Sequence, residues 1–176
     1  MKRTSISLPL SLFALGAAVT ACGGGSFSSQ TADITGDFSV SLTTGSNACE
    51  FTGWTVGSVA MNVPVAIAQQ GTSATATVTG LAAMLLLDAV LGTHEFQGTV
   101  SGDSFALTAF GSTSLKDGDC AFTIKATMTG SISGDAIQGQ ITYTETTNGN
   151  PACGYHATCS SVQSFAGVRA PSDDAG

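Results

Sequence analysis

Positive charge is scarce in this sequence. Its 176 residues include five lysines and arginines against twelve aspartates and glutamates, and only 10% of the residues are charged. Lys2 and Arg3 stand at the N-terminus, which leaves Lys116, Lys125 and Arg169 for the rest of the chain. A surface this acidic repels phosphate backbones and anionic headgroups. We therefore expect no nucleic-acid partner.

Motifs for catalysis are also missing. The sequence has no G-x-S-x-G turn and no phosphate-binding glycine loop. Its two histidines, His94 and His156, lack the H-E-x-x-H spacing and are expected to be solvated loop residues. Asp117 and Asp119 indicate a turn with too few oxygens for calcium. Trp54 is expected to pack on a loop. We predict no enzymatic activity, no cofactor and no metal.

No apolar run is as long as the roughly 18 residues of a membrane-spanning helix. The stretch LPLSLFALGAAV, residues 8–19, follows a basic start and is typical of a signal peptide. It leads into Val19-Thr20-Ala21-Cys22, which resembles the lipobox of bacterial lipoproteins. That resemblance implies cleavage before Cys22 and fatty acylation (palmitate-type chains) of its sulfur. The alternative is ordinary cleavage near Ala21, with an incidental cysteine.

The resemblance also predicts how the chain is divided. Residues 1–21 would be the signal peptide, 22–33 a Gly/Ser tether that does not bury enough apolar surface to order, 34–169 the folded domain, and 170–176 a disordered tail. An aspartate after the lipidated cysteine would resemble an inner-membrane retention signal, and Gly23 stands there instead. We therefore expect a lipid-anchored protein of the cell envelope, with the outer membrane favoured.

Four further cysteines, Cys49, Cys120, Cys153 and Cys159, follow the anchor. An even number in an exported chain predicts two disulfides, with three connectivities open. No C-x-x-C pair is present, so zinc and thioredoxin-type chemistry lack their spacing. Cys153 and Cys159 pair with each other only if the chain between them loops; otherwise each takes Cys49 or Cys120. We favour Cys49–Cys120 with Cys153–Cys159.

Alternation of apolar and polar residues is the main structural signal. It places Phe38, Val40 and Leu42 on one face of a strand, and Met61, Val63, Val65 and Ile67 on one face of another. Such one-sided strands are typical of antiparallel sheets with one wet face. The pattern predicts eight strands, at residues 34–43, 61–69, 73–80, 94–101, 104–112, 120–132, 135–146 and 156–168.

Short turns join several of these strands. GTVSGDSF at residues 98–105 is echoed by GSISGDAI at 130–137, and both place Gly-Asp between alternating segments, as in a tight hairpin. We therefore predict an all-β, eight-stranded antiparallel up-and-down barrel. In that order the loops near 44–59, 113–119 and 147–155, which hold or border the four cysteines, lie at the end opposite the tether and the tail.

One segment breaks the alternation. LAAMLLLDAVLG, residues 81–92, is rich in helix formers and ends at Gly92. We predict one short helix near 82–91 that covers the barrel at the cysteine end. A movable lid over a ligand cavity and a buried strand are the alternatives.

Two residues carry a resemblance to a known family. Gly36-Asp37-Phe38 opens the first strand and Arg169 follows the last, which resembles the G-x-W start and closing basic residue of calycin, or lipocalin-like, barrels, with phenylalanine in place of tryptophan. The resemblance implies that the Arg169 guanidinium packs on the Phe38 ring. The terminal C-x5-C-SVQSF segment is also similar to uncharacterised bacterial lipoproteins, which brings no function.

Two functions follow as hypotheses. The first is an envelope lipoprotein, structural or interacting with a protein partner, that is held on the membrane by its N-terminal lipid. The alternative is a lipocalin-like binder of a small apolar ligand inside the barrel. Large inward residues favour a filled interior, whereas Ala74, Ala76, Ala126 and Gly139 would leave room.

Overall fold

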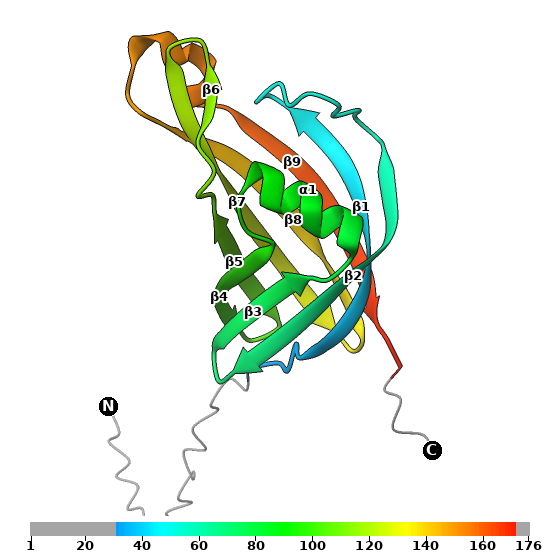
Figure 1. Ribbon diagram of the computed structural model, residues 1–176. Helices are drawn as coiled ribbons and strands as arrows, with labels where there is room; N and C mark the ends of the chain where they lie inside the picture. Colours follow the sequence, from blue (N-terminus) through cyan, green and yellow to red (C-terminus); the bar gives the residue numbers. More distant parts are fainter. Residues whose placement is uncertain (1–30, 172–176) are drawn as a thin grey trace, which may run out of the picture.

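The computed structural model describes residues 31–171, which form nine strands, one α-helix and one 3-10 helix (Figure 1). The strands are β1 (Gly36–Asn47), β2 (Val59–Gln70), β3 (Ser73–Val78), β4 (Glu95–Ser101), β5 (Ser104–Phe110), β6 (Leu115–Asp117), β7 (Cys120–Ser133), β8 (Ala136–Thr147) and β9 (Ser160–Arg169). The helices are α1 (Leu81–Val90) and η1 (Pro151–Ala157). Eight of the strands correspond to those predicted; the three-residue β6 lies in a predicted loop.

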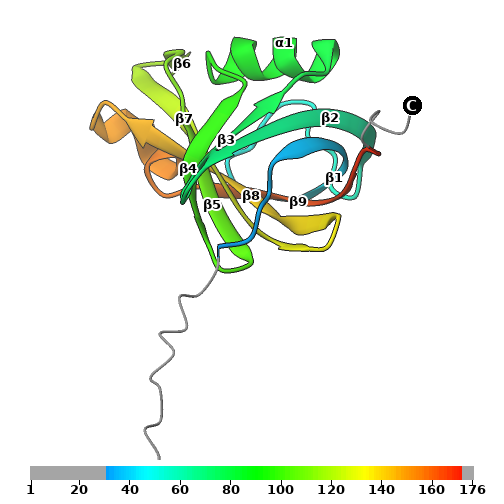
Figure 2. The same ribbon diagram turned by 90° about the horizontal axis from the view of Figure 1, so that it is seen from below.

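Eight strands close into a barrel, as predicted. Each pairs antiparallel with its neighbours in sequence, β5 pairs with β7, and β1 pairs with β9 to complete the ring seen from below in Figure 2. The ninth strand, β6, pairs only with the first residues of β7. The up-and-down order therefore holds around the ring, and β6 extends it at one end.

Both ends of the described chain lie at the same end of the barrel (Figure 1). The amide of Ala32 donates to the Gly102 carbonyl in the β4–β5 turn at 2.9 Å. The amide of Arg169 donates to the Asp135 carbonyl in the β7–β8 turn at 2.8 Å. β6, η1 and both disulfides lie at the opposite end, here called the distal end. This is the arrangement that the up-and-down order predicts.

Side chains fill the barrel interior. Twenty-two buried residues form one apolar cluster that includes Phe38, Phe96, Phe105 and Phe165. Ala74, Ala76 and Ala126, the small residues expected to leave room, are buried members of this cluster.

Gly139 has no room for a side chain. It lies directly opposite Gly130 on β7, and a Cβ atom at Gly139 would stand 2.0 Å from the Thr129 carbonyl oxygen and 2.7 Å from Phe165 Cζ. The missing side chain allows the strands and the Phe165 ring to approach closely.

The alternation of β2 breaks at one point. Met61 was expected to face inward, but it is 69% exposed. A bulge displaces the β1–β2 register between Val40 and Leu42, and Asn62 adopts a φ of 57°. The extra residue turns Met61 outward while Val63 stays buried.

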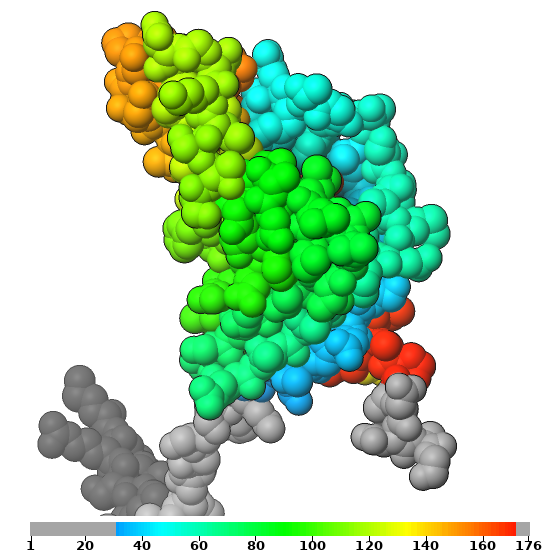
Figure 3. Space-filling view, in the orientation of Figure 1, coloured from blue at the N-terminus to red at the C-terminus, as the bar shows by residue number. Residues whose placement is uncertain are grey.

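The predicted helix is present as α1. It begins after β3, lies across the barrel above β3 and β4, and its side chains cover that face of the molecule (Figures 1 and 3). Ala83, Leu87 and Val90 pack against the core, whereas the outward Leu85 and Leu86 are 58% and 66% exposed. Within residues 31–171, no helix has the length and apolar character needed to cross a bilayer.

The four cysteines form two disulfides, but the favoured pairing was wrong. Cys49 bonds to Cys159 and Cys120 bonds to Cys153. Barrel closure explains the first bond, because β1 ends beside the start of β9 and Asn47 pairs with Ser161. The second follows from the β7–β8 pairing, which ends where Cys120 begins β7 and η1 follows β8. The first disulfide joins the end of β1 to the start of β9, and the second joins the start of β7 to η1.

Candidate functional site

The predicted lipidation residue, Cys22, lies outside the described residues, as do the signal peptide and the tether up to residue 30. The described chain begins at Thr31, at the end of the barrel opposite the disulfides.

The Phe38 and Arg169 pair lies at the end of the barrel where the described chain begins. The two residues face each other across β1 and β9, and the guanidinium carbon stands 5.1 Å from the centre of the Phe38 ring. Arg169 also donates through Nη1 to the Thr35 carbonyl and through Nη2 to the Asp33 carbonyl, the latter at 3.1 Å. Arg169 therefore ties the segment before β1 to the last strand.

Replacing Arg169 with alanine should lower the free energy of unfolding by about 1–2 kcal/mol. A cation over an aromatic ring contributes roughly 0.5–2 kcal/mol, and the backbone carbonyls lose their donors. Urea unfolding followed by circular dichroism measures the change. Lys116→Ala, at an exposed side chain on β6, is the control and should change stability by less than about 0.5 kcal/mol. Equal effects of the two variants would contradict a role for the stacked guanidinium.

An aromatic group packs near the distal end. Trp54 stands 5.7 Å from Tyr143 and 5.8 Å from Phe51 between ring centres. Its indole nitrogen donates to the Gly45 carbonyl at 3.0 Å, and the Tyr143 hydroxyl donates to Gln163 Oε1 at 2.7 Å. The polar atoms of both rings are thus satisfied within the protein, so Trp54 packs on the loop as expected.

The sequence interpretation of His156 was wrong, because this residue is buried. It is 4% exposed, and its Nδ1 lies 2.5 Å from Oε2 of Glu145, itself only 9% exposed. Its Nε2 lies 3.2 Å from Oδ2 of Asp117. Its ring stacks between Phe122 and Tyr155, with centres 4.4 Å and 4.2 Å away. In this cluster a buried imidazole contacts two carboxylates, one of them also buried.

The environment raises the pKa values of the two buried members of this cluster, His156 and Glu145. Burial alone would lower the pKa of His156, but hydrogen bonds to Glu145 and Asp117 outweigh burial and hold that pKa above its ordinary value. Burial raises the pKa of Glu145, against the opposing effect of His156. An acid at an inward position of β8 was the signal in the sequence, because a buried carboxylate needs a partner.

Two further groups of polar side chains are found among residues 31–171. His94 Nδ1 pairs with Asp88 Oδ1 at 2.8 Å, far along the chain from the His156 cluster. In the described residues, Cys49, Glu145 and Cys159 place potential ligand atoms within 4.8 Å of one another. The two sulfurs are bonded to each other, so they offer no thiolates for a metal.

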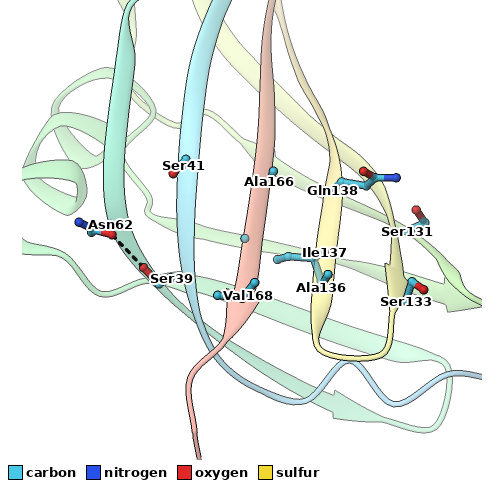
Figure 4. A pocket seen from close by; sticks show the side chains of 11 residues that line it. Ser39, Ser41, Asn62, Ser131, Ser133, Ala136, Ile137, Gln138, Ala166 and Val168 are labelled. Atoms are coloured by element: carbon cyan, nitrogen blue, oxygen red, sulfur yellow. Dashed lines mark hydrogen bonds between the residues drawn. The ribbon is translucent and has the colours of Figure 1, made fainter.

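A shallow hollow of about 500 Å³ lies on the outer face of the barrel, across β2, β1, β9, β8 and β7 (Figure 4). Its polar lining comes from Ser39, Ser41, Asn62, Ser131 and Gln138, with Ser133 at the turn. None of its lining residues is ionisable. It offers hydrogen bonds to an uncharged polar surface and provides no group for proton transfer.

No family model, no curated protein and no solved structure matches the chain.

Proposed function

We propose that this protein is a lipid-anchored lipoprotein of the cell envelope that presents a rigid barrel to a protein partner. The observation that carries the proposal is the placement of the described N-terminal residues. Thr31 follows the lipobox-like segment and its Gly/Ser stretch, and it stands at the end of the barrel opposite both disulfides. An anchor at Cys22 would therefore direct the distal end away from the bilayer.

Chain length supports the same arrangement. Thr31 is nine positions after Cys22 along the chain, and nine residue steps span at most about 30 Å. Acyl chains add roughly 0.8 kcal/mol per buried methylene, and two or more chains hold a protein stably where one does not. The barrel would stay near the membrane while its distal end remained accessible.

The ligand-binding alternative receives no support from a specific observation. The inward side chains pack into one cluster, and the hollow of about 500 Å³ is on the outer face. We therefore base the proposal on display of the barrel surface rather than on a small apolar ligand inside it.

Cys22→Ala tests the anchor. The variant should move from the membrane pellet to the soluble fraction and lose the mass of the acyl chains, because no sulfur remains at that position to carry them. Membrane fractionation with immunoblotting and intact-mass measurement provide the readouts.

Gly23→Asp is the matched control. It should stay in the membrane fraction but shift toward inner-membrane density, since an aspartate there resembles a retention signal. A wild-type protein without acyl mass, or a Cys22→Ala variant that pellets like wild type, would overturn the proposal.

A further inference from the structure

The segment between β8 and β9, residues 148–159 and here called the distal loop, is fastened at several points. Cys153 and Cys159 tie it to Cys120 and Cys49. Asn150 caps η1 by accepting a hydrogen bond from the Ala152 amide at 2.9 Å. Between the two disulfides the chain has a break in its helical conformation at Gly154, which has a φ of 42°. Between these two disulfides, His156 joins the segment to side chains of three strands: Asp117 of β6, Phe122 of β7 and Glu145 of β8.

When both carboxylates are ionised, His156 has to donate a proton from each of its ring nitrogens. Both ring nitrogens face carboxylate oxygens, Nδ1 toward Glu145 at 2.5 Å and Nε2 toward Asp117 at 3.2 Å. An ionised carboxylate only accepts hydrogen bonds, and a neutral imidazole donates from one nitrogen alone. Only the imidazolium ion satisfies both contacts with ionised partners, so the closed loop favours the protonated histidine.

Loss of a proton from the His156 imidazolium would leave the surrounding carboxylates without a positive charge. The charged or titratable groups around the ring are Asp117 from β6, Glu145 from β8 and Tyr155 from η1 itself, whereas β7 contributes the uncharged Phe122. Burial raises the pKa of Tyr155, and the negative charge of Glu50, after β1, raises it further. Without the imidazolium, the buried Glu145 has no cation among these groups, and removing one partner of a buried pair is strongly destabilising.

We propose that protonated His156 is a latch that holds the distal loop against β6 and β8, and that the loop opens when the imidazole loses its proton. The latch lies at the distal end that the proposed function presents to a partner, but it does not depend on the lipid anchor. It makes the shape of that surface responsive to pH.

The direction of the pH response follows from proton linkage. In the closed loop the pKa of His156 is raised, whereas in an open loop it returns to about 6.5. The closed state therefore binds more protons, and the latch is complete below about pH 6.5 and lost as pH rises through the raised value. The raised pKa of Glu145 acts in the same direction at lower pH. The opening constant should increase by up to about tenfold per pH unit between about pH 6.5 and the raised pKa, and level off above it.

Amide hydrogen exchange of the full oxidised chain, measured by mass spectrometry from pH 5 to 9, tests the proposal. After correction for intrinsic exchange rates, wild-type residues 154–158 should open increasingly as pH rises. His156→Gln, which keeps a polar side chain but carries no charge, should exchange faster at acidic pH and lose most of this slope. His94→Gln is the matched control and should retain the wild-type slope.

A wild-type slope equal to that of His156→Gln would overturn the latch. If His156→Gln does not fold, NMR titration of the wild-type imidazole supplies an independent test. A midpoint above about 6.5 that falls in Asp117→Asn supports the proposal, and a midpoint at or below this value refutes it. Neither measurement involves membrane attachment, so failure of the latch is distinguishable from failure of the anchor.

Discussion

Replacing Gly139 with alanine is expected to lower the free energy of unfolding by about 3 kcal/mol, because overpacking a filled interior forces backbone shifts. The added Cβ would stand 2.0 Å from the Thr129 carbonyl oxygen and 2.6 Å from the Gly130 Cα. These neighbours are backbone atoms, which do not move aside by changing a rotamer. The strands β7 and β8 would have to separate where they now touch most closely.

The β7–β8 turn provides the control. Gly134 has a φ of 59° and open space where its Cβ would lie, so Gly134→Ala has only the cost of a left-handed conformation, about 1–2 kcal/mol. Urea unfolding of both variants under non-reducing conditions measures the difference. If Gly139→Ala is no more destabilising than Gly134→Ala, the close approach of the two strands is not as described.

Loss of the Cys49–Cys159 disulfide should have the largest effect among the variants that remove a covalent bond. The bond joins residues 110 apart and encloses most of the barrel, whereas Cys120–Cys153 joins residues 33 apart. Loop-closure entropy predicts losses of about 4.8 and about 3.7 kcal/mol respectively. The double variant Cys49→Ala/Cys159→Ala should therefore unfold at lower urea concentration than Cys120→Ala/Cys153→Ala.

Peptide mapping under non-reducing conditions checks the pairing directly. A linked fragment containing Cys49 and Cys159 is expected, and a fragment linking Cys49 to Cys120 would contradict the structure. Urea midpoints in the reverse order would show that local packing at the Cys120–Cys153 bond outweighs the difference in loop length.

The sequence was sufficient to predict the barrel, because one-sided alternation and Gly-containing turns act within a few residues of one another. The same pattern was insufficient at β2, where a bulge at Asn62 reverses the direction of Met61. Bulges depend on the register of a neighbouring strand, so period-two alternation alone does not reveal them.

The disulfide pairing was missed for a different reason. Closure of an up-and-down barrel places the first and last strands side by side, which brings Cys49 at the end of β1 to Cys159 before β9. The chain between Cys153 and Cys159 is not extended, but Cys153 in η1 reaches Cys120 rather than Cys159. The burial of His156 was missed because its partners, Glu145 and Asp117, come from two other strands and meet it only in the folded chain.

The short strand β6 has a consequence for solubility at high local concentration. Closure pairs the ring strands with one another, whereas β6 has one partner and leaves its other edge unpaired. Exposed strand edges act as templates for intermolecular sheet formation. β6 has only three residues, and two of them are Lys116 and Asp117. Its brevity and its charges oppose the addition of a strand from another molecule, and so oppose aggregation through this edge at high protein concentration.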